Sequence, residues 1–238
     1  GMLGSSVFPA LALSSASAGA LYHKSQAGLM PLAYGAAPAT RAALAAQTAT
    51  NSGLLGAFMV YPSGAWPEAV VGSEFTGDGR GDAALSASFN WDAENDNRLH
   101  LFAQTSGGGL IRAQRLATGN QPTALAAGDF NRDGRRDVVV ANQDDDTLIL
   151  FLHTGAGLTA TLTLPTGAGP DAVAVGDFNG DLRDDIAVVH AISQTVGLYH
   201  QQAAGSFAAP VWLGLSSAGY NDIAVGDLNG DGYDDLVV

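Results

Sequence analysis

Acidic side chains recur four times in the sequence with one short spacing. Each copy is a nine-residue segment with carboxylates at positions 1, 5 and 9 and an amide or hydroxyl at position 3. Ca²⁺ selects hard oxygen donors of this kind, whereas Mg²⁺ takes fewer protein ligands and keeps more water. The candidate metal ligands are Glu74, Thr76, Asp78 and Asp82, then Asp129, Asn131, Asp133 and Asp137, then Asp177, Asn179, Asp181 and Asp185, and finally Asp227, Asn229, Asp231 and Asp235.

The net charge of the chain gives a second reason to expect a bound cation. The sequence has 23 acidic and 10 basic residues, a formal charge of −13, and twelve of the acids are candidate ligands. Without a cation the carboxylates of one loop would repel each other. Four divalent ions carry eight positive charges and would bring the net charge from −13 to −5. We expect two to four Ca²⁺ ions per chain.

The four acidic segments are not equivalent. Segments 129–137 and 227–235 match the pattern at every position, with glycine at position 6. Segment 177–185 has Leu182 at position 6, and segment 74–82 has Glu74 and Thr76 at positions 1 and 3. We therefore expect the last two to bind Ca²⁺ more weakly, or one of them to bind none.

Three other interpretations of the acidic segments fit the sequence less well. Asp, Asn and Gly also favour tight turns, but four copies with three like charges each favour an ion site. An EF-hand needs a glutamate at position 12, where this chain has only Leu or Val. The nonapeptide calcium solenoids have a far shorter repeat than the spacings of 55, 48 and 50 residues here.

The residues around each acidic segment predict the elements that position it. Apolar runs precede and follow every segment, and those that follow are mostly rich in β-branched residues, as in Val138–Ala141. This pattern predicts a hairpin with the acids in its loop. Two further short strands complete each repeat. Four antiparallel strands about every 50 residues predict an all-β fold, a β-propeller of four-stranded blades.

The repeat pattern divides the chain into units. We expect blades over 65–119, 120–167 and 168–217, and an incomplete blade over 218–238. Residues 40–64 match the outer half of a preceding blade. Residues 1–39 fit either the remnant of a signal peptide or a degenerate blade.

The segments Pro122 to Asp137 and Pro170 to Asp185 resemble the FG-GAP (VCBS-type) repeat of integrin α-chain propellers and many secreted bacterial proteins. The resemblance implies calcium in the loop between the first and second strands of a blade. It also implies an extracellular or cell-surface location and a role in adhesion or ligand recognition, without fixing the ligand. Such propellers usually have seven blades. About four and a half here indicate either a fragment or a smaller ring closed by 40–64 and 220–238.

Composition excludes several functional classes. The negative charge opposes binding to nucleic acid, and no apolar run is long enough to span a bilayer. The absence of cysteine excludes thiolate metal sites and cysteine nucleophiles. No serine nucleophile elbow or phosphate-binding loop is present in the sequence.

The expected function is therefore noncatalytic recognition of an extracellular protein or a glycan. Trp66 and Trp91 are candidate ligand residues, because exposed aromatics on the face away from calcium could stack on a sugar ring; packing between blades is the alternative for both. The alternative function is a secreted polysaccharide-degrading enzyme. Its acid and base would come from the loop with Asp92, Glu94 and Asp96.

Overall fold

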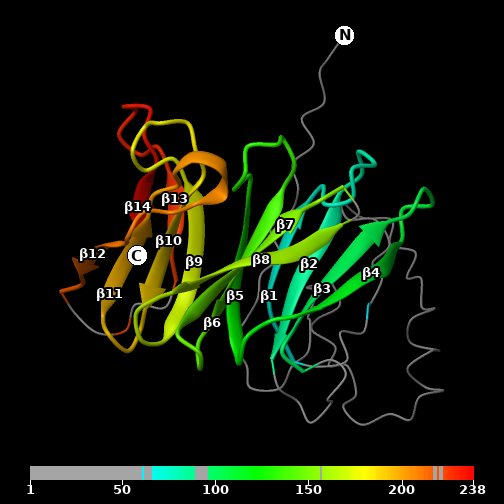
Figure 1. The fold of residues 1–238 in the computed structure, drawn as a ribbon, viewed down its shortest axis with the longest axis horizontal. Coiled ribbons are helices and arrows are strands. Elements are labelled where there is room, and N and C mark those ends of the chain that lie inside the picture. Colours follow the sequence, from blue (N-terminus) through cyan, green and yellow to red (C-terminus); the bar gives the residue numbers. More distant parts are fainter. Residues whose placement is uncertain (1–60, 62–65, 89–95, 156, 217–218, 220–221) are drawn as a thin grey trace, which may run out of the picture. The chain divides into compact units, whose positions relative to one another are not determined.

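A computed structural model describes residues 61, 66–88, 96–155, 157–216, 219 and 222–238 of the chain (Figure 1). The chain divides into two compact units, Gly1–Val60 and Tyr61–Val238, and every described residue belongs to the second. The predictions for residues 1–39, and for 40–64 apart from Tyr61, lie outside the described residues.

The described unit is built from antiparallel sheets. β1–β4, β5–β8 and β9–β12 form three four-stranded sheets in chain order, and β13 pairs with β14. The described residues contain a single short 3-10 turn, Ala203–Gly205, and no helix long and apolar enough to cross a membrane. The strands are β1 (Trp66–Ser73), β2 (Asp82–Ser88), β3 (Arg98–Gln104), β4 (Leu110–Ala117), β5 (Pro122–Gly128), β6 (Asp137–Asn142), β7 (Thr147–His153), β8 (Leu158–Pro165), β9 (Pro170–Gly176), β10 (Asp185–His190), β11 (Thr195–Tyr199), β12 (Val211–Gly214), β13 (Ala224–Gly226) and β14 (Asp235–Val237).

Burial differs from strand to strand within each four-stranded sheet. Every residue of β6 and β10 is buried, as expected for apolar, β-branched strands covered on both faces. The outermost strands β4 and β8 have many exposed residues. Each four-stranded sheet thus has a buried second strand and a solvent-facing fourth strand.

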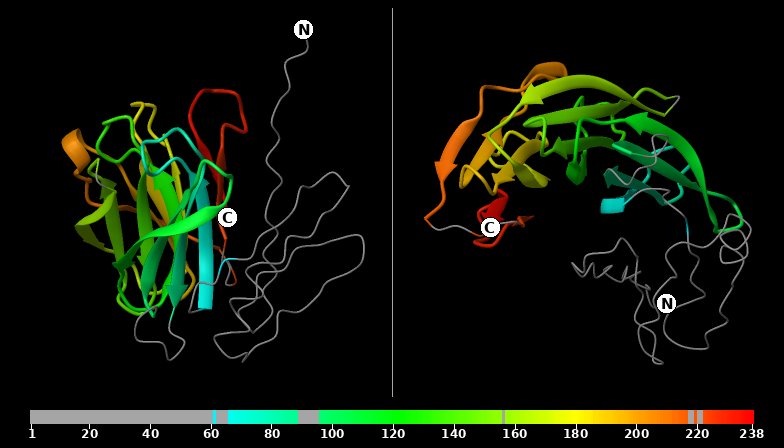
Figure 2. Two further views of the ribbon diagram at one scale, coloured as in Figure 1. Left: turned by 90° about the vertical axis from the view of Figure 1, so that its right-hand side faces the viewer. Right: turned by 90° about the horizontal axis from the view of Figure 1, so that it is seen from below.

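Neighbouring sheets pack face to face. One buried cluster joins Phe75 and Leu99 to Val138 and Phe151 across the first two sheets. A second cluster joins Phe130 and the middle strands of the second sheet to residues of the third sheet such as Ile186. Within this unit the first strands β1, β5, β9 and β13 are successive neighbours, and the sheets follow one another along an arc (Figure 2). These are the blades of a β-propeller, as the sequence predicts.

Close approach between blades depends on a glycine at the end of β5. A Cβ added to Gly128 would lie 2.9 Å from Cγ1 of Val175 in β9 and 2.9 Å from the Phe130 ring. The apolar run that precedes the acidic segment therefore ends in glycine because the next blade occupies the space of a side chain.

Candidate metal centre

The four acidic segments occupy the same place in each sheet. They are the loops β1–β2, β5–β6, β9–β10 and β13–β14, and position 9 is always the first residue of the second strand. In each hairpin the position-9 aspartate pairs with the residue just before position 1, as Asp137 does with Gly128. The register of the hairpin therefore brings both ends of the acidic segment together.

The position-1 carboxylates accept hydrogen bonds from the backbone of their own loops. Asp177 accepts the N–H groups of Gly180 at 2.7 Å, Asp181 at 3.0 Å and Leu182 at 2.8 Å. Asp227 accepts the equivalent three N–H groups, and these donors lower its pKa. The loops thus fold tightly around the first carboxylate, and in the fourth loop the donors favour its charged form.

Positions 3 and 5 continue this pattern on the exposed part of the loop. Asn131 Oδ1 accepts the N–H of Asp133 at 2.9 Å, and Asp133 Oδ1 accepts the N–H of Arg135 at 2.9 Å. The third and fourth loops repeat both bonds. These side-chain oxygens are held in defined places near solvent, where an ion could reach them.

The position-9 aspartates are buried and join the loop to the sheet. Asp137 accepts the N–H of Phe130 at 2.9 Å through Oδ2 and the N–H of His153, at the end of β7, at 2.7 Å through Oδ1. Burial raises the pKa of Asp137 to about 6; the two N–H donors oppose this, and the carboxylates of Asp133 and Asp129 add to it. The raised pKa therefore reflects mainly the burial of this carboxyl group, with a smaller contribution from the two neighbouring carboxylates.

In the third loop, position 9 has an imidazole partner. Asp185 accepts the N–H of Gln201 at 2.7 Å and lies 2.8 Å from Nδ1 of His200. Burial raises the pKa of Asp185, and the interaction with His200 opposes the rise. Asp82 in the first loop accepts the backbone N–H groups of Phe75 and Gln104. In the first three loops, position 9 thus accepts a backbone N–H from the end of the third strand or just beyond it.

The carboxylates of one loop are held separately rather than gathered on one point. Among the described residues, no group of three or more Asp, Glu or His side chains is arranged to hold a metal ion. The carboxylates instead accept hydrogen bonds from the backbone N–H groups described above. The donor set itself, three carboxylates and one amide or hydroxyl oxygen per loop, suits Ca²⁺.

Ion pairs distinguish the loops from one another. Asp78 and Asp181, both at position 5, form ion pairs with Arg80 and Arg183 two residues later. The guanidinium of Arg135 lies beside Gly155 instead of Asp133, and the fourth loop has tyrosine at this position. An ion in the first or third loop would have to compete with an arginine for its ligand.

Two acidic residues that the sequence analysis did not single out connect neighbouring loops. Asp184, at position 8, accepts the N–H of Asp129 at 2.6 Å and lies 3.2 Å from Arg136. Asp234 accepts the N–H of Asp177 at 2.8 Å in the same way. The sequence signal for both residues is the aspartate at position 8 of the last two acidic segments.

Of the other predicted site residues, Trp66 and Asp96 are described, and both lie away from these loops. Trp66 is the first residue of β1, at the opposite end from the first loop, and is 45% exposed. Asp96 is buried. Trp91, Asp92 and Glu94 lie outside the described residues, so the glycan and acid–base hypotheses for that loop stay predictions.

The blades and the repeated acidic loop define a β-propeller repeat protein. The FG-GAP-like repeat family matches three times, over residues 74–140, 129–188 and 177–238, and the chain belongs to this family. A comparison with curated proteins gives no significant match.

Several solved structures are similar to this chain at low sequence identity. A functionally unknown protein from Desulfotomaculum acetoxidans DSM 771 has a TM-score of 0.50 and 15% identity, with 70% of this chain and 47% of that chain covered. The periplasmic gluconolactonase of Pseudomonas aeruginosa has a TM-score of 0.46 and 21% identity, with 67% of this chain and 42% of that chain covered. A putative 6-phosphogluconolactonase of Bacteroides fragilis has a TM-score of 0.48 and 19% identity, with 69% of this chain and 43% of that chain covered. The chain thus spans less than half of each of these structures.

Proposed function

We propose that this chain is a calcium-stabilised β-propeller module that recognises an extracellular protein or a glycan without catalysing a reaction. The observation that carries the proposal is the acidic loop itself, repeated four times at the same place in the sheets. Positions 1, 3, 5 and 9 of each loop would hold the ion. Bound Ca²⁺ would neutralise the carboxylates and tie the exposed part of the loop to the buried position 9.

Differences between the loops support a ranking of affinity. Asp133 and Asp231 belong to loops with glycine at position 6, whereas Asp78 and Asp181 are already paired with arginine. We expect the loops at 129–137 and 227–235 to bind Ca²⁺ more tightly than the other two.

The environment proposed for the protein follows from the kind of site. Exposed loops with only three carboxylates each suit the weaker calcium affinities of extracellular modules, with Kd around 10⁻⁴–10⁻³ M. The resemblance to secreted and cell-surface propellers also supports an extracellular location.

Competition between cations tests the calcium assignment. Equilibrium dialysis of the protein against radioactive Ca²⁺ in a tenfold excess of Mg²⁺ is expected to leave Ca²⁺ bound, since Mg²⁺ gives up its water reluctantly. Dialysis in a hundredfold excess of Na⁺ is the control for nonspecific attraction to a chain of charge −13. Loss of the bound Ca²⁺ in either excess would contradict a selective calcium site.

A further inference from the structure

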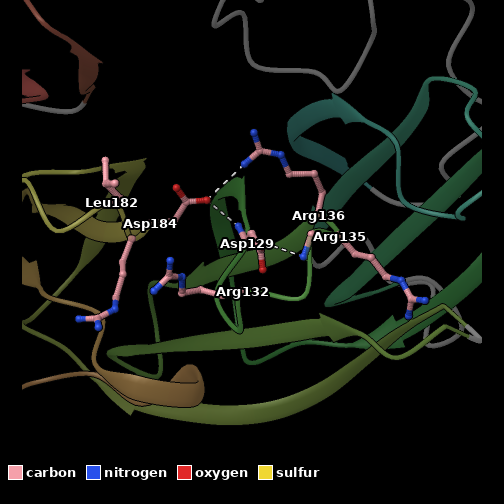
Figure 3. Close-up of a pocket in the computed structure, with 8 residues that line it drawn as sticks. Asp129, Arg132, Arg135, Arg136, Leu182 and Asp184 are labelled. Atoms are coloured by element: carbon pink, nitrogen blue, oxygen red, sulfur yellow. Dashed lines mark hydrogen bonds and ion pairs between the residues drawn. The ribbon is translucent and has the colours of Figure 1, made fainter. Parts of the chain in front are cut away.

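A basic pocket lies between the acidic loops of the second and third blades. It has a volume of about 510 Å³, and its charged lining is Arg132, Arg135, Arg136 and Arg183 with Asp129 and Asp184 (Figure 3). These are four of only nine arginines in a chain of charge −13. We call this cavity the interloop pocket. The lining of the pocket is rich in positive charge, whereas the protein as a whole is strongly negative.

Two of these arginines are neutralised by neighbouring carboxylates, and the other two, Arg132 and Arg135, form no ion pair with a described residue; Arg135 extends away from Asp184 (Figure 3). Arg136 lies 3.2 Å from Asp184, and Arg183 lies 2.9 Å from Asp181. The guanidinium of Arg132 makes no ion pair or hydrogen bond with any other described residue, and it extends toward the loop of Leu182 and Asp184 (Figure 3). Within the described structure, Nε of Arg183 is buried and also lacks a partner. Donors for a negatively charged group therefore remain in the pocket.

Two residues that line the interloop pocket, Arg132 and Leu182, adopt an unfavourable backbone conformation. Arg132 has φ of 61° and Leu182 has φ of 60°, in the left-handed region that disfavours residues with a Cβ. At both positions the other three loops have glycine with positive φ. Both exceptions line the interloop pocket, and Leu182 is 82% exposed. Strained residues that replace the glycine of sister loops at one pocket indicate that their side chains are used there.

We infer that the interloop pocket binds an oxyanion, the carboxylate, sulfate or phosphate group of a small ligand. Arg132 is the principal donor, because a free guanidinium offers two parallel N–H groups that match such oxygens. Leu182 covers an apolar part of the ligand. The volume falls within the range of small-molecule sites. This site uses different residues from calcium binding except for Asp129, and it goes beyond the proposed function.

The test is a calorimetric titration of the whole chain with three anionic probes, sodium sulfate, sodium galacturonate and inorganic phosphate, with galactose as the neutral control. Ionic strength is held constant with NaCl. Metal is removed with a chelating resin, because EDTA is itself a polyanion. At least one anion is expected to bind with heat while galactose gives none, and the preferred probe identifies sulfate, carboxylate or phosphate as the group.

The decisive variant is Arg132→Gly, which installs the residue that the other three loops use. It is expected to keep or raise the unfolding midpoint and to weaken anion binding at least tenfold. Arg115→Gln on β4 removes the same charge elsewhere, and Gln194→Gly relieves a positive φ of 54° in the β10–β11 turn. Both controls are expected to bind anions within twofold of the wild type. If Arg132→Gly fails to fold, Arg132→Gln replaces it with the same expected loss.

Two results would overturn the inference. One is the absence of binding heat for all three anions, and the other is equal anion affinity in wild type and Arg132 variants. The same titrations with sulfate and galacturonate are repeated in 1 mM CaCl₂. Anion binding in a protein that takes up no calcium would contradict the metal proposal alone, so the two failures are distinguishable.

Discussion

Ca²⁺ at about 10 mM is expected to raise the midpoint of thermal unfolding of the metal-free protein by about 10 °C or more. This concentration is a hundredfold excess over a Kd of about 10⁻⁴ M, the tighter end of the range for extracellular modules, and such an excess stabilises the folded state by about 2.7 kcal/mol per site. Two strong loops would therefore contribute about 5 kcal/mol. In a domain of this size 1 kcal/mol shifts the midpoint by about 2–4 °C. Circular dichroism during heating, in metal-free buffer and with Ca²⁺, measures the shift.

The controls separate calcium ligation from charge screening. NaCl at the same ionic strength, and Mg²⁺ at the same concentration, are expected to give much smaller shifts. The double variant Asp133→Ala, Asp231→Ala removes position 5 from the two loops without an arginine pair, and should lose most of the calcium-dependent rise. An equal rise with NaCl, or an unchanged rise in the double variant, would mean that these loops are not the sites.

The second large effect concerns Asp137 at position 9. Asp137→Ala leaves the buried N–H groups of Phe130 and His153 without their acceptor. Each unsatisfied buried group costs about 1–3 kcal/mol, so we expect the free energy of unfolding to fall by about 4 kcal/mol. Urea unfolding measures this loss, which should be present in metal-free buffer and with Ca²⁺.

Asp133→Ala is the matched comparison for this variant within one loop. Its side chain is exposed and accepts a single backbone N–H from Arg135, so its removal should cost less than about 1 kcal/mol in metal-free buffer. With Ca²⁺ it should lose the calcium-dependent stabilisation of its loop. Equal effects of the two variants in metal-free buffer would contradict a structural role specific to position 9.

Much of the fold could be predicted because the repeat is visible in both the types of residue and their spacing along the chain. Apolar runs on either side of each acidic segment are long enough for one strand each, and a turn-forming segment between them leaves a hairpin as the simplest outcome. Four short strands about every 50 residues indicate the blade architecture, and the family resemblance in Pro122 to Asp137 agrees with it. Residue pairs close in sequence, such as Asp129 and Asp133, were therefore placed in one loop correctly.

The features that could not be predicted depend on contacts between distant segments. Asp184 binds the backbone of Asp129, 55 residues earlier, and the pocket beside them exists only because two blades are neighbours. Sequence spacing also does not say which atoms a carboxylate faces. Position 9 was expected only as a metal ligand, whereas the structure shows Asp137 as a buried acceptor for two strands' backbone groups.

The central claim, that the repeated acidic loops bind calcium, is tested most directly by calorimetric titration of the metal-free chain with CaCl₂. The account predicts two to four ions per chain, with one site fewer in Asp231→Ala. Absence of binding heat in a chain shown by circular dichroism to be folded would contradict it. The loops would then be turns held only by backbone hydrogen bonds, and the extracellular assignment that depends on calcium would fall with them.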